Sequence, residues 1–135
     1  MTYWDDSLLI GFPLIDDQHR KMVEMIDRLM LACEEEKGKT EIGRALGFTV
    51  NYVKEHFRDE ESLQERYAYP GINAHKRLHA QFAMKVSEIV KEFDRLGPVP
   101  SLVKKLNGAL VEWLILHISV EDMKIGEHIQ QVTNK

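Results

Sequence analysis

The chain has 135 residues, of which 44% are hydrophobic and 30% are charged, and this length and composition are typical of one soluble domain with a single core. The formal net charge is −4, with lysines and arginines spread along the chain, which argues against nucleic-acid binding. The single cysteine, Cys33, cannot form an internal disulfide, as is usual in a reducing compartment. It lies in register with apolar residues, and we expect it to fill core space.

Residues 1–15 do not resemble a signal peptide, because two aspartates stand where such a peptide carries cationic residues. The apolar stretch 8–15 is interrupted by Gly11 and Pro13 and is too short to cross a membrane. We therefore expect no membrane insertion and a cytoplasmic location. Residues 1–15 are predicted to form an extended N-terminal arm that packs on the rest of the domain through four apolar side chains: Trp4, Leu9, Phe12 and Leu14.

Three breaks divide the rest of the chain into four segments, at Gly38, at Pro70 with Gly71, and at residues 97–100. Within each segment apolar residues recur every three or four positions, which is the period of an amphipathic helix. No segment shows the alternation that is typical of a strand. Helices joined by short turns must alternate in direction, so the sequence predicts an all-α, up-down-up-down antiparallel four-helix bundle over about residues 16–122.

The ends of the predicted helices carry weaker signals. Asp16 or Asp17 can cap the first helix and Ser101 the fourth, because such side chains accept hydrogen bonds from free backbone N–H groups. Residues 123–135 are expected to form a short polar tail, which could be a short helix. His128 lies among polar residues of that tail, and we expect it on the surface. Residues 1–135 then form a single domain.

The apolar faces are interrupted by polar residues of types that bind metals: His19, His56, Glu60, His75, His79 and His117, with Asp122 beside them. A lone histidine on an apolar face is more often a hydrogen-bonded core residue than a ligand. Burial of a polar group without a partner costs about 1–3 kcal/mol, so several such groups in one small core must satisfy one another. A shared metal would do this. In an antiparallel bundle, all of these positions fall at the same end.

The spacing of these residues excludes one familiar site and leaves one question open. His75 and His79 lie on one face of a helix, but the zinc-protease motif H-E-x-x-H needs a glutamate where this chain has Lys76. His117 and Asp122 are separated by five positions, which is about 140° around an ideal helix. Asp122 could approach a metal from an adjacent strip of the helix, or a local π-helical widening could bring it into line.

The strings DDQH, HFRDE, HKRLH and HISVED follow one another as H…HxxxE…HxxxH…HxxxxD, and all seven positions of this pattern are filled. In this the chain resembles the hemerythrin family, and single-domain bacterial hemerythrins in particular, over nearly its whole length. The resemblance implies a non-heme di-iron centre, with two iron ions bridged by an oxo or hydroxo group. The ligands of one iron would be His75, His79 and His117. Those of the other would be His19 and His56, and the bridging carboxylates would be Glu60 and Asp122.

This assignment gives the two irons unequal numbers of histidines. If each iron takes about six ligands, the iron with three histidines is full and the iron with two has one open position. The resemblance implies that dioxygen binds there reversibly, for oxygen transport, storage, delivery or sensing, without enzymatic turnover. We expect a monomer, and no oxygen-consuming partner enzyme can be identified. The apolar side chains expected around the gas, where they would limit access of water and protons, are Phe57, Trp113, Leu114 and Ile118.

Two other functions are possible for such a cluster. A di-iron oxidase, a peroxidase or an iron-handling enzyme could use the same residues. Carboxylate-rich di-iron enzymes carry a Glu-x-x-His motif on each of two helices, whereas this chain has His-x-x-x-Glu, which favours binding over oxidation. Zinc prefers four ligands, and seven convergent groups are too many for one such ion.

Overall fold

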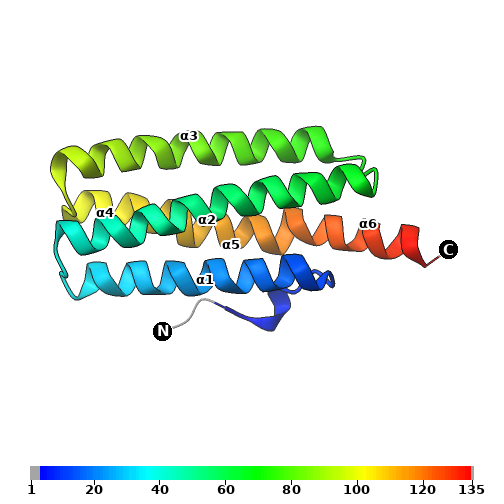
Figure 1. The fold of residues 1–135 in the computed structure, drawn as a ribbon, viewed down its shortest axis with the longest axis horizontal. Coiled ribbons are helices and arrows are strands. Elements are labelled where there is room, and N and C mark those ends of the chain that lie inside the picture. Colours follow the sequence, from blue (N-terminus) through cyan, green and yellow to red (C-terminus); the bar gives the residue numbers. More distant parts are fainter. Residues whose placement is uncertain (1–3, 135) are drawn as a thin grey trace.

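The computed structural model describes residues 4–134, and in that range it contains helices and turns but no strand. A short 3₁₀ turn, η1 (Asp6–Leu8), precedes three long helices: α1 (Pro13–Glu34), α2 (Lys39–Arg66) and α3 (Ile72–Leu96). The fourth helix consists of α4 (Pro100–Asn107), η2 (Gly108–Trp113), α5 (Leu114–His117), η3 (Ile118–Asp122) and α6 (Met123–Thr133). Figure 1 shows that neighbouring helices run in opposite directions, which confirms the predicted antiparallel four-helix bundle.

The fourth helix is continuous, although two of its segments, η2 and η3, are π-helical. The backbone stays right-handed and helical across each junction, for example at Leu114 with φ −67° and ψ −42°. The short helix that the sequence allowed after Asp122 is α6, which continues the fourth helix and buries Ile125 and Ile129. These two apolar residues are one helical turn apart, a spacing that already indicates a buried helix face.

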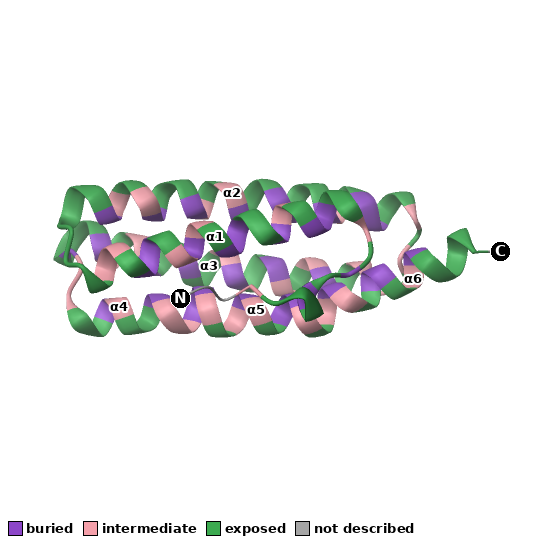
Figure 2. Cartoon of the chain, turned by 90° about the horizontal axis from the view of Figure 1, so that it is seen from below, coloured by how far each residue is buried: buried purple, intermediate pink, exposed green. Residues whose placement is uncertain are grey.

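Each helix turns one apolar stripe toward the bundle axis, as Figure 2 shows by its purple inward-facing positions. Burial of a large apolar side chain such as Ile26 or Leu110 stabilises the fold by about 1.5–3 kcal/mol. The turns that join α1 to α2 and α3 to α4 use Gly38 (φ 97°) and Gly97 (φ 74°). Both glycines have positive φ angles that would strain another residue, so the predicted breaks coincide with the turns.

The residues predicted to cap the helices do not do so. The residue that precedes α1 is Phe12, and the one that precedes α4 is Val99; neither end has a side-chain cap. In both helices a proline occupies the first turn, where its missing N–H would be unpaired in any case and its fixed φ suits the helix. The cap prediction failed because this proline signal outweighs a nearby aspartate or serine.

Asp16 has another role, which is to hold the N-terminal arm. Its carboxylate accepts hydrogen bonds from the backbone N–H groups of Ile10, at 2.7 Å, and Gly11, at 3.2 Å. Leu8 and Ile10 are buried, and η1 lies against η3 of the fourth helix. The arm thus covers the bundle beside α6.

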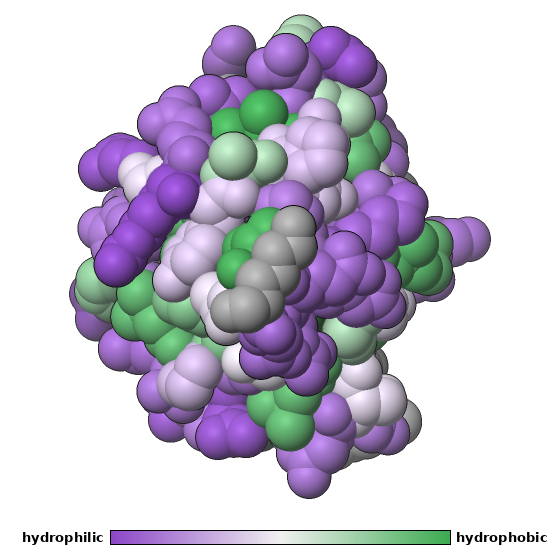
Figure 3. Space-filling model, turned by 90° about the vertical axis from the view of Figure 1, so that its right-hand side faces the viewer, coloured by the Kyte–Doolittle hydropathy of each residue, from purple (hydrophilic) through white to green (hydrophobic). Residues whose placement is uncertain are grey.

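The predicted anchors of this arm are only half right. Trp4 and Phe12 pack against the bundle, whereas Leu9 and Leu14 are exposed. Hydrophilic side chains cover most of the bundle end that carries the C-terminus, with hydrophobic side chains between them (Figure 3). Among the helices of residues 4–134, none combines the length and the apolar character needed to cross a membrane.

We predict that Gly126→Ala lowers the free energy of unfolding of the metal-free protein by about 1–3 kcal/mol, as overpacking does elsewhere. A Cβ at Gly126 would overlap the carbonyl oxygen of Ile10, so the arm would have to move away from α6. The control is Gly47→Ala, because Gly47 is an exposed residue of α2 and a Cβ added there would meet nothing within 4 Å. It should raise stability by about 0.5–1 kcal/mol. Equal stability of the two variants in urea unfolding would contradict this packing.

Candidate metal centre

The structure brings all seven candidate ligands together inside the bundle. Each of them is at most 4% exposed. They come from every long helix: His19 from α1, His56 and Glu60 from α2, His75 and His79 from α3, His117 from α5 and Asp122 from η3. All lie in the half of the bundle that contains the turn between α2 and α3.

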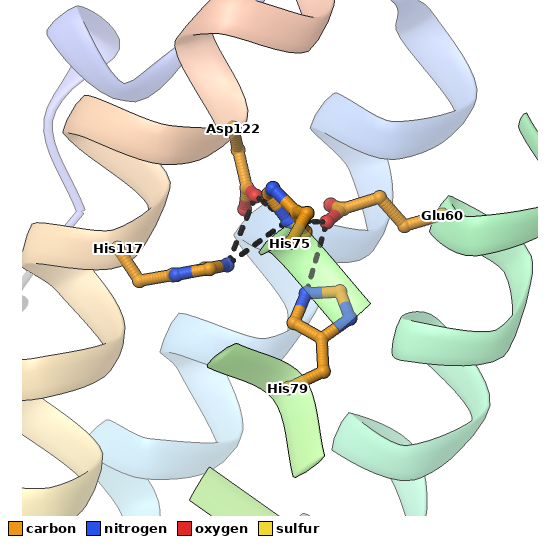
Figure 4. A group of neighbouring side chains, drawn as sticks. All are labelled: Glu60, His75, His79, His117 and Asp122. Carbon is orange, nitrogen blue, oxygen red and sulfur yellow. Dashed lines mark hydrogen bonds and ion pairs between the residues drawn. The ribbon is translucent and has the colours of Figure 1, made fainter. Parts of the chain in front are cut away.

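Their ligand atoms form two groups that overlap. One group contains Glu60, His75, His79, His117 and Asp122 (Figure 4), and the other contains His19, His56, Glu60 and Asp122. Within each group the ligand atoms lie within 4.8 Å of one another. The two carboxylates belong to both groups, while each histidine belongs to one. Three histidines therefore stand on one side and two on the other.

Each carboxylate turns one oxygen toward each group. Glu60 places Oε1 2.8 Å from Nε2 of His75, and Oε2 3.0 Å from Nε2 of His56. Asp122 places Oδ1 2.9 Å from Nε2 of His75, and Oδ2 3.1 Å from Nε2 of His19. Each carboxylate thus has one oxygen available to each of the two groups.

The spacing of the histidine nitrogens suits ligands of a shared cation better than it suits hydrogen bonds between the histidines. Nε2 of His19 lies 3.0 Å from Nε2 of His56, and Nε2 of His75 lies 3.1 Å from Nε2 of His117. One proton at most can lie between two such nitrogens. Nε2 of His79 and Oδ1 of Asp122 are buried without a hydrogen bond of acceptable geometry. Neighbouring ligands of an octahedral ion with bonds of about 2.1 Å lie about 3.0 Å apart, which matches these spacings.

The π-helical segment η3 answers the question that the spacing of His117 and Asp122 left open. The segment adds a residue to the turn between them, so both side chains point into the cluster (Figure 4). Nε2 of His117 lies 3.2 Å from Oδ1 of Asp122. The local widening, rather than an approach from an adjacent strip, positions Asp122.

Two residues outside the cluster orient its histidines, and the sequence reasoning missed both. Nδ1–H of His56 donates to Oε1 of Gln18 at 2.7 Å, and Nδ1–H of His79 donates to Oε2 of Glu61 at 2.9 Å. Each bond directs the opposite ring nitrogen, Nε2, to the cluster. The available signal was adjacency, because Gln18 precedes His19 and Glu61 follows Glu60 in the sequence.

Aromatic rings and aliphatic side chains enclose the cluster. The ring of Phe57 stacks on His79 with centroids 3.8 Å apart, and Trp113 stacks on His117 at 4.8 Å. Leu114 and Ile118 are fully buried, whereas Trp113 is only partly buried. Of the four residues expected around a bound gas, Trp113 alone thus reaches the surface.

His128 is not a free surface residue, contrary to our expectation. It is partly buried, and its Nε2–H donates to the backbone carbonyl of Tyr67 at 2.8 Å. Its ring lies 5.5 Å from that of Tyr69. Because the tail is helical, His128 reaches the turn that joins α2 to α3 and fastens α6 to it.

The metal-free cluster holds charges that are stabilised by one another. Burial and the charge of Glu60 raise the pKa of Asp122, but hydrogen bonds from histidines outweigh them and hold it at about 2. Burial opposes the protonation of His19 and His75, yet their bonds to Asp122 and Glu60 raise both pKa values to about 9. Burial likewise acts against the charge of Glu60, but four histidines hold its pKa well below the usual range.

An all-α bundle with a buried cluster of five histidines and two carboxylates is a metal-binding helical protein. The sequence profile of the hemerythrin HHE cation binding domain matches residues 11–129. The chain therefore belongs to the hemerythrin family.

Three relatives illustrate the likeness, and each carries the name bacteriohemerythrin. The protein of Stenotrophomonas maltophilia is 32% identical over 135 residues, which cover 100% of this chain and 86% of the relative. That of Pseudomonas aeruginosa is 36% identical over 119 residues, covering 88% and 75%. That of Campylobacter jejuni is 27% identical over 135 residues and covers both chains completely.

We predict that Gln18→Ala and Glu61→Ala each weaken the binding of ferrous or cobaltous ions by about 10- to 100-fold, the usual effect of removing such a partner. Competition with a chromophoric chelator would measure this. The control is Glu65→Ala, which removes an exposed carboxylate on the same helix as Glu61 that pairs with Lys76. Unchanged affinity in both test variants would contradict the orienting role.

Protons and metal should compete for this cluster. Because His19 and His75 have raised pKa values, their protonation stabilises the metal-free fold below pH 6.5, and this stabilisation is lost as the pH rises through about 9. We predict that the metal-free protein loses stability over this range while the stabilisation by added Co²⁺ increases. Thermal unfolding at several pH values would measure both trends. Parallel trends with and without metal would contradict the prediction.

Proposed function

We propose that the chain binds two iron ions and carries dioxygen reversibly at a single open position. The observation that supports this most is the unequal division of histidines between two groups that share both carboxylates. With about six ligands to each iron, His75, His79 and His117 would complete one coordination sphere together with the bridging groups. His19 and His56 would leave the other sphere one ligand short.

The bound group would supply chemistry that the protein lacks: two ferrous ions with an oxo or hydroxo bridge provide the electrons that reversible binding of dioxygen requires. The protein contributes charge and orientation. The carboxylates of Glu60 and Asp122 would balance part of the positive charge of the cations. The hydrogen bonds of Gln18 and Glu61 fix the orientation of His56 and His79.

Phe57, Leu114 and Ile118 are buried residues that we assign to the surroundings of the gas. They offer no group that could donate a proton, and they limit the approach of water. A ligand that receives no proton from its surroundings leaves as intact dioxygen, which favours carriage over reduction. Trp113, stacked on His117, covers the cluster from the outer side.

The alternative is an oxidase, peroxidase or iron-handling enzyme at the same site. Among residues 4–134, two carboxylates reach the cluster, and the other five of its seven candidate ligand residues are histidines. Such a set stabilises oxidised iron less than a carboxylate-rich set does, which favours binding. The names of the relatives support the same choice. We assign the protein to oxygen transport, storage, delivery or sensing, as a cytoplasmic monomer; its free Cys33 and mixed-charge surface are compatible with this.

We predict that the protein reconstituted with Fe²⁺ under argon binds two irons per chain and is nearly colourless. Air should produce a coloured form with charge-transfer bands in the visible range, and a return to argon should remove them over repeated cycles. Metal analysis and absorption spectroscopy measure the two quantities. Immediate irreversible oxidation with continuous peroxide turnover would favour the enzyme instead, and one iron per chain would contradict the di-iron assignment.

A further inference from the structure

An apolar cavity lies between α2 and α3, beside the candidate metal centre. It is a small cavity of about 10 Å³, about the room that one water-sized molecule needs, and its exposed lining is entirely apolar. Val53 and Phe57 of α2, Phe82 and Ala83 of α3, and Leu110 of η2 form most of its wall. Water entering such a space would lose hydrogen bonds without replacement, whereas a small apolar molecule would lose none.

The inner wall of the cavity is a residue that touches the cluster. Phe57 lines the cavity, and the same ring stacks on His79 with centroids 3.8 Å apart. Its centroid also lies 6.1 Å from that of His56 and 6.4 Å from that of His117. One aromatic ring therefore separates the cavity from histidines of both groups.

The outer end of the cavity adjoins the solvent. A second, more open groove runs along the same pair of helices, past Gly47 and Ser87, and shares Val50 and Lys54 with the cavity. Lys54 is exposed, and only its hydrocarbon stem contributes to the apolar lining. Motion of this flexible side chain suffices to join the groove to the cavity.

We propose that this cavity is the access path and transient binding site for a small apolar gas on its way to the metal centre. The proposal rests on the proposed function, because it supplies the gas that the open position takes. Lys54 covers the outer end, and Phe57 is the last side chain before the histidines. An apolar passage admits dioxygen and rejects ions, which agrees with a site that must exclude proton donors.

A hollow beside His117 is the competing route. It is lined by Leu78, Leu116 and Val120, with Glu121 at its edge, and part of its lining is polar. Trp113 and the candidate ligand His117 also line this hollow, and their ring centroids lie 4.8 Å apart. Water and ions can enter such an opening, so it discriminates less well for an apolar gas.

Xenon is a suitable probe, because it enters dry apolar cavities and needs no iron. In the metal-free protein, ¹²⁹Xe NMR should detect xenon exchange in the wild type and lose it in Ala83→Leu, which fills the cavity. Val50→Phe, at the shared end, provides a second obstruction should the first variant be unstable. The matched control is Ala80→Leu, on the exposed face of the same helix, which should bind xenon normally.

Oxygen kinetics then test the path in the reconstituted protein. Ala83→Leu should slow association and dissociation by the same factor, roughly tenfold, because obstruction raises one barrier for both directions. The equilibrium affinity should stay unchanged, which separates an access path from damage to the site. Rates in Ala80→Leu should equal those of the wild type.

Two outcomes would overturn the proposal. One is the absence of xenon from the wild-type cavity. The other is an oxygen association rate that persists in Ala83→Leu and Val50→Phe but falls in Leu116→Trp, which obstructs the hollow beside His117. Failure of reversible oxygen binding in the wild type would instead overturn the proposed function, and the xenon result distinguishes the two cases.

Discussion

Seven polar side chains buried in one small apolar core are the constraint on which the rest of this structure depends. Five imidazoles and two carboxylates are each at most 4% exposed, and their atoms approach to about 3 Å. Burial of such groups is tolerated only when they satisfy one another or a bound cation. The lowered pKa values of Glu60 and Asp122 and the raised pKa values of His19 and His75 express this mutual dependence. The convergence of these groups is what a cation-binding site requires.

The fourth helix adapts to this cluster more than the others do. The segment η3 departs from the α-helical repeat so that His117 and Asp122 face the same point, and the arm lies against that segment. Asp16 holds the arm, Gly126 leaves room for it, and His128 fastens the following turns to the α2–α3 turn. A local distortion of the helix is thus supported by contacts on either side, as a precisely oriented ligand requires.

The sequence predicts the features that depend on periodicity. Apolar stripes defined the four helices, and the polar residues that interrupt them are the ones that converge. Features that depend on tertiary contacts could not be predicted from the sequence. Leu9 and Leu14 are exposed although the sequence predicts them as arm anchors, because hydrophobicity alone does not specify which side of a turn faces inward. Gln18 and Glu61 resemble ordinary surface residues in the sequence, and only the paths of α1 and α2 bring them to His56 and His79. The choice of a π-helix at η3 likewise depends on packing.

The proposed binding of a gas depends on one histidine, because one group contains three histidines and the other contains two. Both groups share the same two carboxylates, so in the proposed centre an iron held by His19 and His56 would be the one with room for another ligand. A crystal structure of the reduced protein, with anomalous scattering measured at the iron edge, tests this most directly. We predict two iron peaks, with Glu60 and Asp122 bound to both, and a coordination sphere that is one ligand short only at the iron bound by His19 and His56. A single peak, or two irons with equally filled coordination spheres, would contradict it.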